Sequence, residues 1–127
     1  MSDATRSPRF EPLTPAVFYI LLALATQDRH GYGIMKQAES DSSGQIHLGP
    51  GTLYGTIKRL LAAGHIVEAG EQTDPELDDQ RRRYYRLSPS GRQLLGLELE
   101  RLEHAVEAAR QQHILPHHKL DGNLGRD

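Results

Sequence analysis

Apolar residues cluster along the chain in a pattern that predicts four helices and one β-hairpin. Thr14-Pro15 supplies an N-cap followed by a proline at the first helical position. The following residues 17–24 are apolar on most of a helix surface, so we expect this helix to be buried on more than one side. The segment "QDRHG" interrupts the pattern. A second helix is then predicted from about Gly31-Tyr32 to a turn that ends at Gly44.

A third helix is predicted between Pro50 and Gly64, because proline suits the first helical position and glycine suits a C-terminal cap. The alternate apolar positions Ile46 and Leu48 just before it predict a very short strand. Within the helix, apolar residues at i, i+4, i+7 and i+8 form one stripe that should pack on the first two helices. The stripe consists of Leu53, Ile57, Leu60 and Leu61.

Two segments rich in β-branched and aromatic residues, "HIVEAG" and "RRRYYRL", flank the polar loop "EQTDPELDDQ" and predict a hairpin. Ser88-Pro89 then opens a final helix that should run to about His113. This order is that of a winged helix-turn-helix with an added helix. We predict a mainly α fold with a small β-hairpin, in four parts. These are a flexible arm (1–12), a winged helix-turn-helix DNA-binding domain (13–88), a C-terminal dimerisation helix (89–113) and a disordered tail (114–127).

The face of the third helix opposite its leucine stripe carries small hydroxyls and cations, with a tyrosine and a glycine at its edge. Threonines donate hydrogen bonds, cations neutralise phosphates and glycine permits close backbone approach, so this face suits a DNA groove. The free N–H groups at the start of the helix also favour phosphate. The alternative is a solvated polar face, which any surface helix has. The face consists of Thr52, Tyr54, Gly55, Thr56, Lys58 and Arg59.

The second strand of the hairpin is predicted to present two different faces. Alternation places Arg83, Tyr85 and Leu87 on one face and Arg82, Tyr84 and Arg86 on the other. Tyr85 and Leu87 suit the core. Arg81, Arg82 and Tyr84 would then lie at the loop end, where a wing meets a DNA backbone or minor groove. Alternatively, these arginines pair with acids of the preceding strand and loop, because residues 61–80 carry six acids and no Lys or Arg.

The last helix carries an apolar seam with the 4-3-4-3 spacing of a coiled coil. The winged domain should close its own core without this helix, so we predict that a second copy of the chain covers the seam. Such a homodimer would hold two third helices about 34 Å apart, the spacing of half-sites in a palindrome. Packing of the seam against the first helix of the same chain is the alternative. The seam consists of Leu95, Leu99, Leu102, Val106 and Ala109.

Composition narrows the classes of function. The 127 residues suit one domain, and we find no apolar run that predicts a membrane span or a secretion signal. The chain has no cysteine, which excludes disulfides and thiolate metal sites and makes the cytoplasm the simplest location. The net charge of −2 argues against a uniformly basic coat for nucleic acid, although residues 81–92 carry five arginines and no acid.

The histidines of the chain do not predict catalysis or a metal site. His113, His117 and His118, with Asp121 nearby, resemble a metal cluster, but their Pro- and Gly-rich tail gives no framework to fix ligand geometry. His30 and His65 flank helices and should be capping or surface groups. The sequence contains no nucleophile elbow, P-loop, dinucleotide fingerprint or HExxH motif. We expect neither an enzyme nor a cofactor.

Three segments together resemble the PadR family of transcriptional regulators: "HGYGIMKQAE", "LGPGTLYGTIKRLLAAGHI" and "RRRYYRLSPSGRQLL". Their order and spacing carry the resemblance, which covers about residues 13–112. The resemblance implies a repressor of double-stranded operator DNA that dimerises through its C-terminal helix. It also implies that Tyr32 lies near the DNA backbone, that the segment from Gly51 to Arg59 reads the groove, and that Arg81, Arg82 and Arg83 form the wing.

The resemblance further implies release by a small aromatic or lipophilic effector. The residues that we consider for its site are Phe18, Tyr19, Leu22, Leu99 and Leu102, and core packing is their alternative role. One departure from the family pattern is the acidic loop from Asp74 to Asp79, which could hold the wing tip away from phosphate. The rival hypothesis is a winged-helix module that binds protein in place of DNA.

Overall fold

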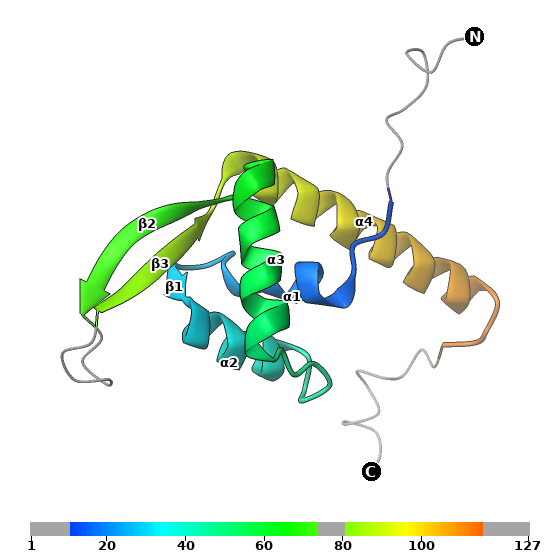
Figure 1. Cartoon of the computed structure of the whole chain (residues 1–127). Coiled ribbons are helices and arrows are strands. Elements are labelled where there is room, and N and C mark those ends of the chain that lie inside the picture. The colour runs from blue at the N-terminus through cyan, green and yellow to red at the C-terminus, as the bar shows by residue number, and fades with distance from the viewer. Residues whose placement is uncertain (1–10, 74–80, 116–127) are drawn as a thin grey trace, which may run out of the picture. The chain divides into compact units, whose positions relative to one another are not determined.

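The computed structural model describes residues 11–73 and 81–115 (Figure 1). The expectations for most of the arm and the tail, including His117, His118 and Asp121, lie outside this part, as does the acidic loop at 74–79. The chain divides into two compact units, the first ending at Leu95 and the second beginning at Gly96. The elements are α1 (Pro15–Ala23), β1 (Arg29–His30), α2 (Gly31–Asp41), α3 (Pro50–Ala63), β2 (Ile66–Thr73), β3 (Arg81–Leu87) and α4 (Pro89–Gln111).

The helix boundaries follow the capping residues that the sequence predicts. The Thr14 hydroxyl accepts a hydrogen bond from the Val17 N–H at 3.2 Å, and Pro15 begins α1. Pro50 begins α3, and Gly64 caps its end at φ = 81°. This left-handed conformation strains a residue with a Cβ, so glycine suits the position. The predicted ends of the third helix are therefore confirmed.

The core of the first unit lies where the three helices meet the sheet. The helix α3 packs across α1 and α2 and contacts β2 (Figure 1). As predicted, the apolar stripe of α3 faces the core. Leu53, Ile57 and Leu60 are buried, and Leu61 is partly buried and packs against the core. Tyr85 and Leu87 of β3 are also buried, as expected for the core side of the wing. The core residues from the three helices and their connections are Ile20, Leu21, Ala23, Leu24, Ile34, Ala38, Leu48, Leu53, Ile57 and Leu60.

The sheet contains the predicted hairpin, β2 and β3, but its third strand is not the one expected. Its strand order is β1-β3-β2, and β1 pairs with β3 so that Arg29 lies opposite Tyr85 and His30 opposite Tyr84. The two residues of β1 fall in the segment "QDRHG", which we expected only to interrupt the helices. A two-residue strand is too short to show any periodicity, and its position is set by the partner strand.

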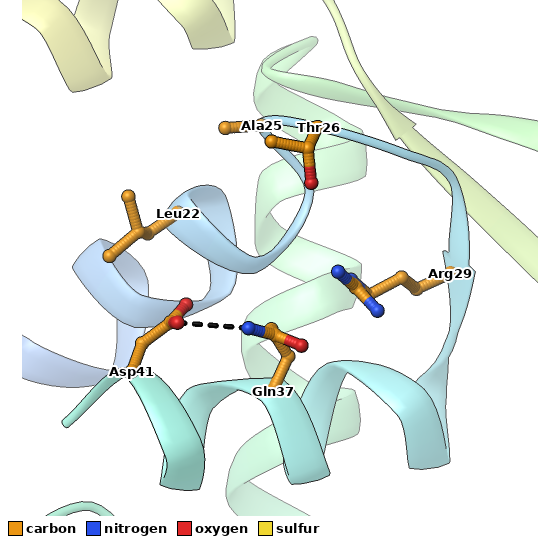
Figure 2. Close-up of a pocket in the computed structure, with 6 residues that line it drawn as sticks. All are labelled: Leu22, Ala25, Thr26, Arg29, Gln37 and Asp41. Carbon is orange, nitrogen blue, oxygen red and sulfur yellow. Dashed lines mark hydrogen bonds between the residues drawn. The ribbon is translucent and has the colours of Figure 1, made fainter. Parts of the chain in front are cut away.

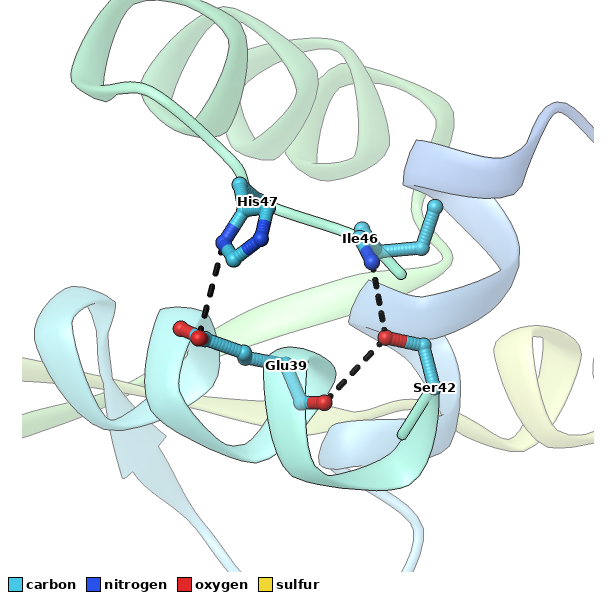
Figure 3. Close-up of polar contacts among 4 residues, drawn as sticks. All are labelled: Glu39, Ser42, Ile46 and His47. Carbon is cyan, nitrogen blue, oxygen red and sulfur yellow. Dashed lines mark hydrogen bonds and ion pairs between the residues drawn. The ribbon is translucent and has the colours of Figure 1, made fainter. Parts of the chain in front are cut away.

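The strand predicted at Ile46 and Leu48 is wrong, because these residues form an extended connection between α2 and α3. The Ile46 N–H donates to the Ser42 hydroxyl at 2.9 Å, and this hydroxyl donates to the Glu39 carbonyl (Figure 3). His47 lies 3.5 Å from the Glu39 carboxylate. The polar groups of this connection thus bond to the end of α2, and Leu48 enters the core.

Two serines join the end of α3 to the start of α4. The Ser88 hydroxyl donates to the Gly64 carbonyl at 2.7 Å and accepts from the Gly91 N–H at 3.1 Å. The Ser90 hydroxyl also donates to Gly64, at 3.0 Å, and lies 3.1 Å from Nδ1 of His65. These bonds satisfy backbone groups at both helix ends. They give a structural reason for the co-occurrence of "GHI" and "SPSG" in the sequence.

The helix α4 starts at Pro89, as predicted, and ends at Gln111, two residues before the expected position. The assignment of Leu95 to a dimer seam needs correction. Its side chain is 4% exposed and belongs to the core of the first unit. The seam therefore begins at its next member, Leu99, in the second unit. Leu99, Leu102 and Val106 are exposed there. Among the described helices, none combines the length and apolar character of a membrane span.

Candidate nucleic-acid interface

The helix α3 has two chemically different faces, as the sequence predicts. Leu53, Ile57 and Leu60 are buried, and the other side is exposed. That side begins with Gly51 and Thr52 in the first turn and continues through Tyr54 to Lys58 and Arg59. Because no acid lies on α3, the exposed face is cationic as well as polar.

The prediction for Thr56 is wrong, because this residue is only 1% exposed. It lies three residues after Leu53 and four before Leu60, so helical spacing places it within the buried stripe. Its hydroxyl accepts a hydrogen bond from the Arg59 guanidinium at 3.2 Å. The Arg59 side chain also runs back over Gly55, where an added Cβ would lie 3.7 Å from its Nη1 atom. Thr56 thus holds Arg59 on the helix surface and is not itself part of the exposed face.

Aromatic rings surround the start of α2. The His30 Nδ1 atom accepts from the Gly33 N–H at 3.0 Å, which confirms the predicted capping role. The His30 ring stacks on exposed Tyr32 and meets Tyr84 of the wing edge-on, with ring centroids 6.4 and 5.2 Å apart. These contacts bring Tyr32 and Tyr84, which we predicted from separate motifs, against the same histidine ring.

Lys36 is a cation of this region that sequence reasoning missed. Its ammonium lies 5.4 Å from the centre of the Tyr32 ring, within the range of a cation–π contact. The signal was available, because Tyr32 and Lys36 are four residues apart on one helix and therefore share a face. Lys36, in the middle of α2, adds positive charge beside the predicted backbone contact of Tyr32.

Tyr54 links α3 to the start of α2. A Cβ added to Gly31 would overlap the Tyr54 hydroxyl and lie 2.7 Å from its Cζ atom. Tyr54 also interacts electrostatically with buried Tyr85 of the wing. Burial raises the pKa of Tyr85 most, Arg83 lowers it, and Glu68 and Tyr54 raise it further. The exposed edge of α3, the start of α2 and the wing therefore meet around this tyrosine.

The wing arginines have different surroundings. Arg83 lies 3.6 Å from the Glu68 carboxylate and 4.0 Å from that of Glu71, so for this residue pairing with the preceding strand is confirmed. Arg86 instead forms two hydrogen bonds to Asp28, which precedes β1, at 2.9 and 3.1 Å. Arg82 is partly buried, and Arg81 begins β3. The acids of β2 thus offset part of the positive charge of the wing.

A separate hollow of about 250 Å³ lies between the end of α1 and α2 (Figure 2). The Arg29 Nε atom donates to the Ala23 carbonyl at 2.6 Å, and Gln37 donates to Asp41 at 2.9 Å. Leu22 is the member of the predicted effector set that lines it, whereas Phe18 and Tyr19 pack partly buried against the core. The residues that line the hollow are Leu22, Ala25, Thr26, Arg29, Gln37 and Asp41.

Three packed helices, an exposed polar face on the third and an antiparallel wing define a winged helix-turn-helix protein. Residues 20–97 match the model of the transcriptional regulator PadR-like family. The chain therefore belongs to the PadR-like family of transcriptional regulators, as the three quoted segments indicated. Members of this family are transcription regulators and not enzymes, which agrees with the sequence.

Solved structures share this fold. A transcriptional regulator from Clostridium thermocellum is 25% identical, with a TM-score of 0.60 over 75% of this chain and 89% of that one. Bacillus subtilis PadR in complex with operator DNA is 22% identical, with a TM-score of 0.56 over 65% of this chain and 45% of that one. An uncharacterized 37.1 kDa protein of transposon TN4556 from Streptomyces fradiae is 39% identical over 80 residues. That match covers 63% of this chain but only 21% of the relative.

Proposed function

We propose that this protein is a sequence-specific repressor that binds a palindromic operator as a homodimer through α3. The observation that carries the proposal is the exposed, acid-free face of α3 in a chain of the PadR-like family. Thr52, Tyr54 and Lys58 reach base edges in this proposal, and Gly51 and Gly55 allow the backbone of α3 to approach the duplex. The operator complex of the Bacillus subtilis relative supports duplex DNA as the target.

Contacts to the phosphate backbone come from the elements beside α3. Tyr32 and Lys36, on successive turns of α2, are exposed and lie together, so we assign them to one stretch of the DNA backbone. Arg59, which Thr56 holds on the helix, adds a cation beside the reading face. Arg81, Arg82 and Tyr84 are assigned to the backbone or minor groove at the wing. Such contacts fix the register of the protein on DNA without reading its sequence.

Dimerisation through α4 supports this reading mode. In the second unit, Leu99, Leu102 and Val106 are 42%, 36% and 40% exposed, and the partly exposed Ala109 continues their seam. A two-fold pair that buries these residues presents two α3 helices to successive half-sites, and the binding energies of the two combine. One winged helix alone would bind DNA at the non-specific level, about 10⁻⁴–10⁻⁶ M.

The Lys58→Ala variant tests the proposed reading face. We expect its affinity for a duplex from the region upstream of the protein's own gene to fall by about 1–2 kcal/mol, roughly five- to thirtyfold. Discrimination against unrelated duplexes should fall as well, and the salt slope of binding should flatten by about 2, one for each subunit of the dimer. Fluorescence anisotropy at several salt concentrations measures all three quantities.

The matched control for Lys58→Ala is Arg110→Ala, which removes one partly exposed cation from α4 and should leave affinity within about twofold. If the wild-type chain binds every duplex equally and Lys58→Ala changes nothing, the proposal is wrong. A winged-helix module that binds protein would give that result.

The acids of β2 should weaken the contact between wing and DNA, because they compensate Arg83 beside the expected phosphates. We expect the Glu68→Gln/Glu71→Gln variant to bind the operator about three- to tenfold more tightly, with a salt slope steeper by about 2, one for each subunit of the dimer. Stability should change by less than about 0.5 kcal/mol, since exposed ion pairs contribute little. The control Glu100→Gln/Glu103→Gln changes the net charge equally on α4. Equal effects of the two double variants would assign the gain to net charge alone.

We propose release of the operator by a small aromatic or lipophilic ligand as the regulatory step. Such a ligand must bind the DNA-incompetent form more tightly, because equal affinity for both forms would shift nothing.

The location that follows from operator binding is the cytoplasm.

A further inference from the structure

Gly31 and Tyr54 come from two different sequence motifs, "HGYG" and "GTLY", and meet in the structure. A Cβ at position 31 would overlap the Tyr54 hydroxyl and lie 2.7 Å from Cζ and 2.8 Å from Cε1. All three atoms belong to the phenol ring, and no backbone atom is among the three nearest. The ring therefore occupies the space that any other residue at position 31 would fill.

Space, and not backbone conformation, explains glycine at position 31. The described glycines with positive φ are Gly44, Gly64 and Gly70, so Gly31 has the conformation of an ordinary helical residue. A methyl group here would be compatible with the helix and would even favour it. Gly33, two residues later, gives a direct comparison, because its added Cβ would make only ordinary contacts at 3.5 Å and beyond.

The contact matters because much of the Tyr54 side chain is exposed to solvent. Its side chain is 51% exposed and lies at the edge of the exposed face of α3. A half-exposed tyrosine changes rotamer readily unless a neighbour restricts it. The buried backbone at Gly31 forms a surface on which the ring rests, so that the ring starts from one orientation before DNA arrives.

We infer that Gly31 is a positioning residue for operator recognition, which holds the Tyr54 ring in its reading orientation without touching DNA itself. This inference rests on the proposed DNA-binding function. Its physical basis is pre-organisation, because a side chain that is fixed before binding loses less conformational freedom when the complex forms. The Gly31→Ala variant should fold normally and displace the ring, since the end of a flexible side chain can move aside.

The experiment compares Gly31→Ala with Gly33→Ala in the full chain, alone and combined with Tyr54→Ala. Labelling with 3-fluorotyrosine gives five fluorine signals for the five tyrosines, and the Tyr54→Phe variant identifies that of Tyr54. Without DNA, Gly31→Ala should shift the Tyr54 signal and Gly33→Ala should leave it in place. Thermal denaturation checks that both variants are folded.

Operator affinity then tests the functional half of the inference. Gly31→Ala should weaken binding about tenfold, close to the effect of Tyr54→Ala, and Gly33→Ala should stay within about twofold. The double variant Gly31→Ala/Tyr54→Ala should be no weaker than Tyr54→Ala alone, because both changes act through one ring.

Two kinds of failure are distinguishable. If the wild-type chain discriminates the operator but Gly31→Ala binds it with unchanged affinity, or the two effects add, the positioning role of Gly31 is wrong and the proposed function stands. If the wild-type chain does not discriminate the operator, the proposed function fails and this inference fails with it.

Discussion

The Leu102→Glu variant is expected to be monomeric at micromolar concentrations and to bind the operator at least about a hundredfold more weakly than the wild-type chain. Leu102 lies in the middle of the exposed seam of α4, with Leu99 one step before it and Val106 one step after. Burying one leucine contributes about 1.5–3 kcal/mol, and two-fold symmetry doubles the contribution. A carboxylate there would also be desolvated without a partner. Sedimentation velocity gives the oligomeric state, and anisotropy gives the affinity.

Leu97→Glu is the matched control for this variant. Leu97 is 45% exposed on the same helix, but it lies about 200° around the helix from Leu99 and therefore outside the seam. The control should remain dimeric and keep its affinity. A Leu102→Glu chain that stays dimeric would show that the seam is not the interface, and a wild-type monomer would show that no such dimer forms.

The Gly91→Ala variant is expected to lose about 2–3 kcal/mol of unfolding free energy. Its added Cβ would overlap the His65 carbonyl oxygen and lie 2.9 Å from both the His65 carbonyl carbon and Cδ1 of Leu87. Two of these three atoms belong to the His65 backbone, so movement of the Leu87 side chain alone would not make room. Movement of α4 away from His65 would also disturb the hydrogen bonds that Ser88 makes to Gly64 and Gly91. Urea denaturation followed by circular dichroism measures the loss.

Gly96 provides the comparison within the same helix. An added Cβ at Gly96 meets no atom within 4 Å, so Gly96→Ala should stabilise the chain by about 0.5–1 kcal/mol through helix propensity alone. If Gly91→Ala and Gly96→Ala had equal effects, the close approach of α4 to the end of α3 would be contradicted.

Local signals in the sequence were enough to predict most of the fold. Thr14, Pro15, Pro50 and Gly64 mark helix ends by their own conformational preferences, and the structure places the ends there. The buried stripe of α3 and the inward face of β3 follow from periodicity, which depends only on residues within the same element. These features needed no knowledge of the partners that each element contacts.

Two residues lie on a different face of their helix from the one that we predict. The hydroxyl of Thr56 favours the exposed face, but its spacing from Leu53 and Leu60 places it in the buried stripe. Leu95 fits the heptad spacing of the seam, but the first turns of α4 complete the core of the winged unit. In both cases tertiary packing of the helix face, and not the residue type or the heptad repeat, determines burial.

Other features depend on tertiary contacts that no local pattern shows. The strand β1 exists because β3 pairs with Arg29 and His30. The contact of Gly31 with Tyr54 joins residues 23 positions apart, and the compensation of Arg83 depends on the register of the hairpin. Such contacts determine how much of the exposed face of α3 and of the wing is available for the proposed contact with DNA.

Selection of binding sites from a random duplex library tests the central claim most directly. If a homodimer reads DNA through the exposed face of α3, the selected sequences should contain an inverted repeat with half-site centres about one duplex turn, roughly 10 bp, apart. Two chains should be bound to each selected duplex. Selection of no common sequence, or of a single half-site occupied by one chain, would contradict the account.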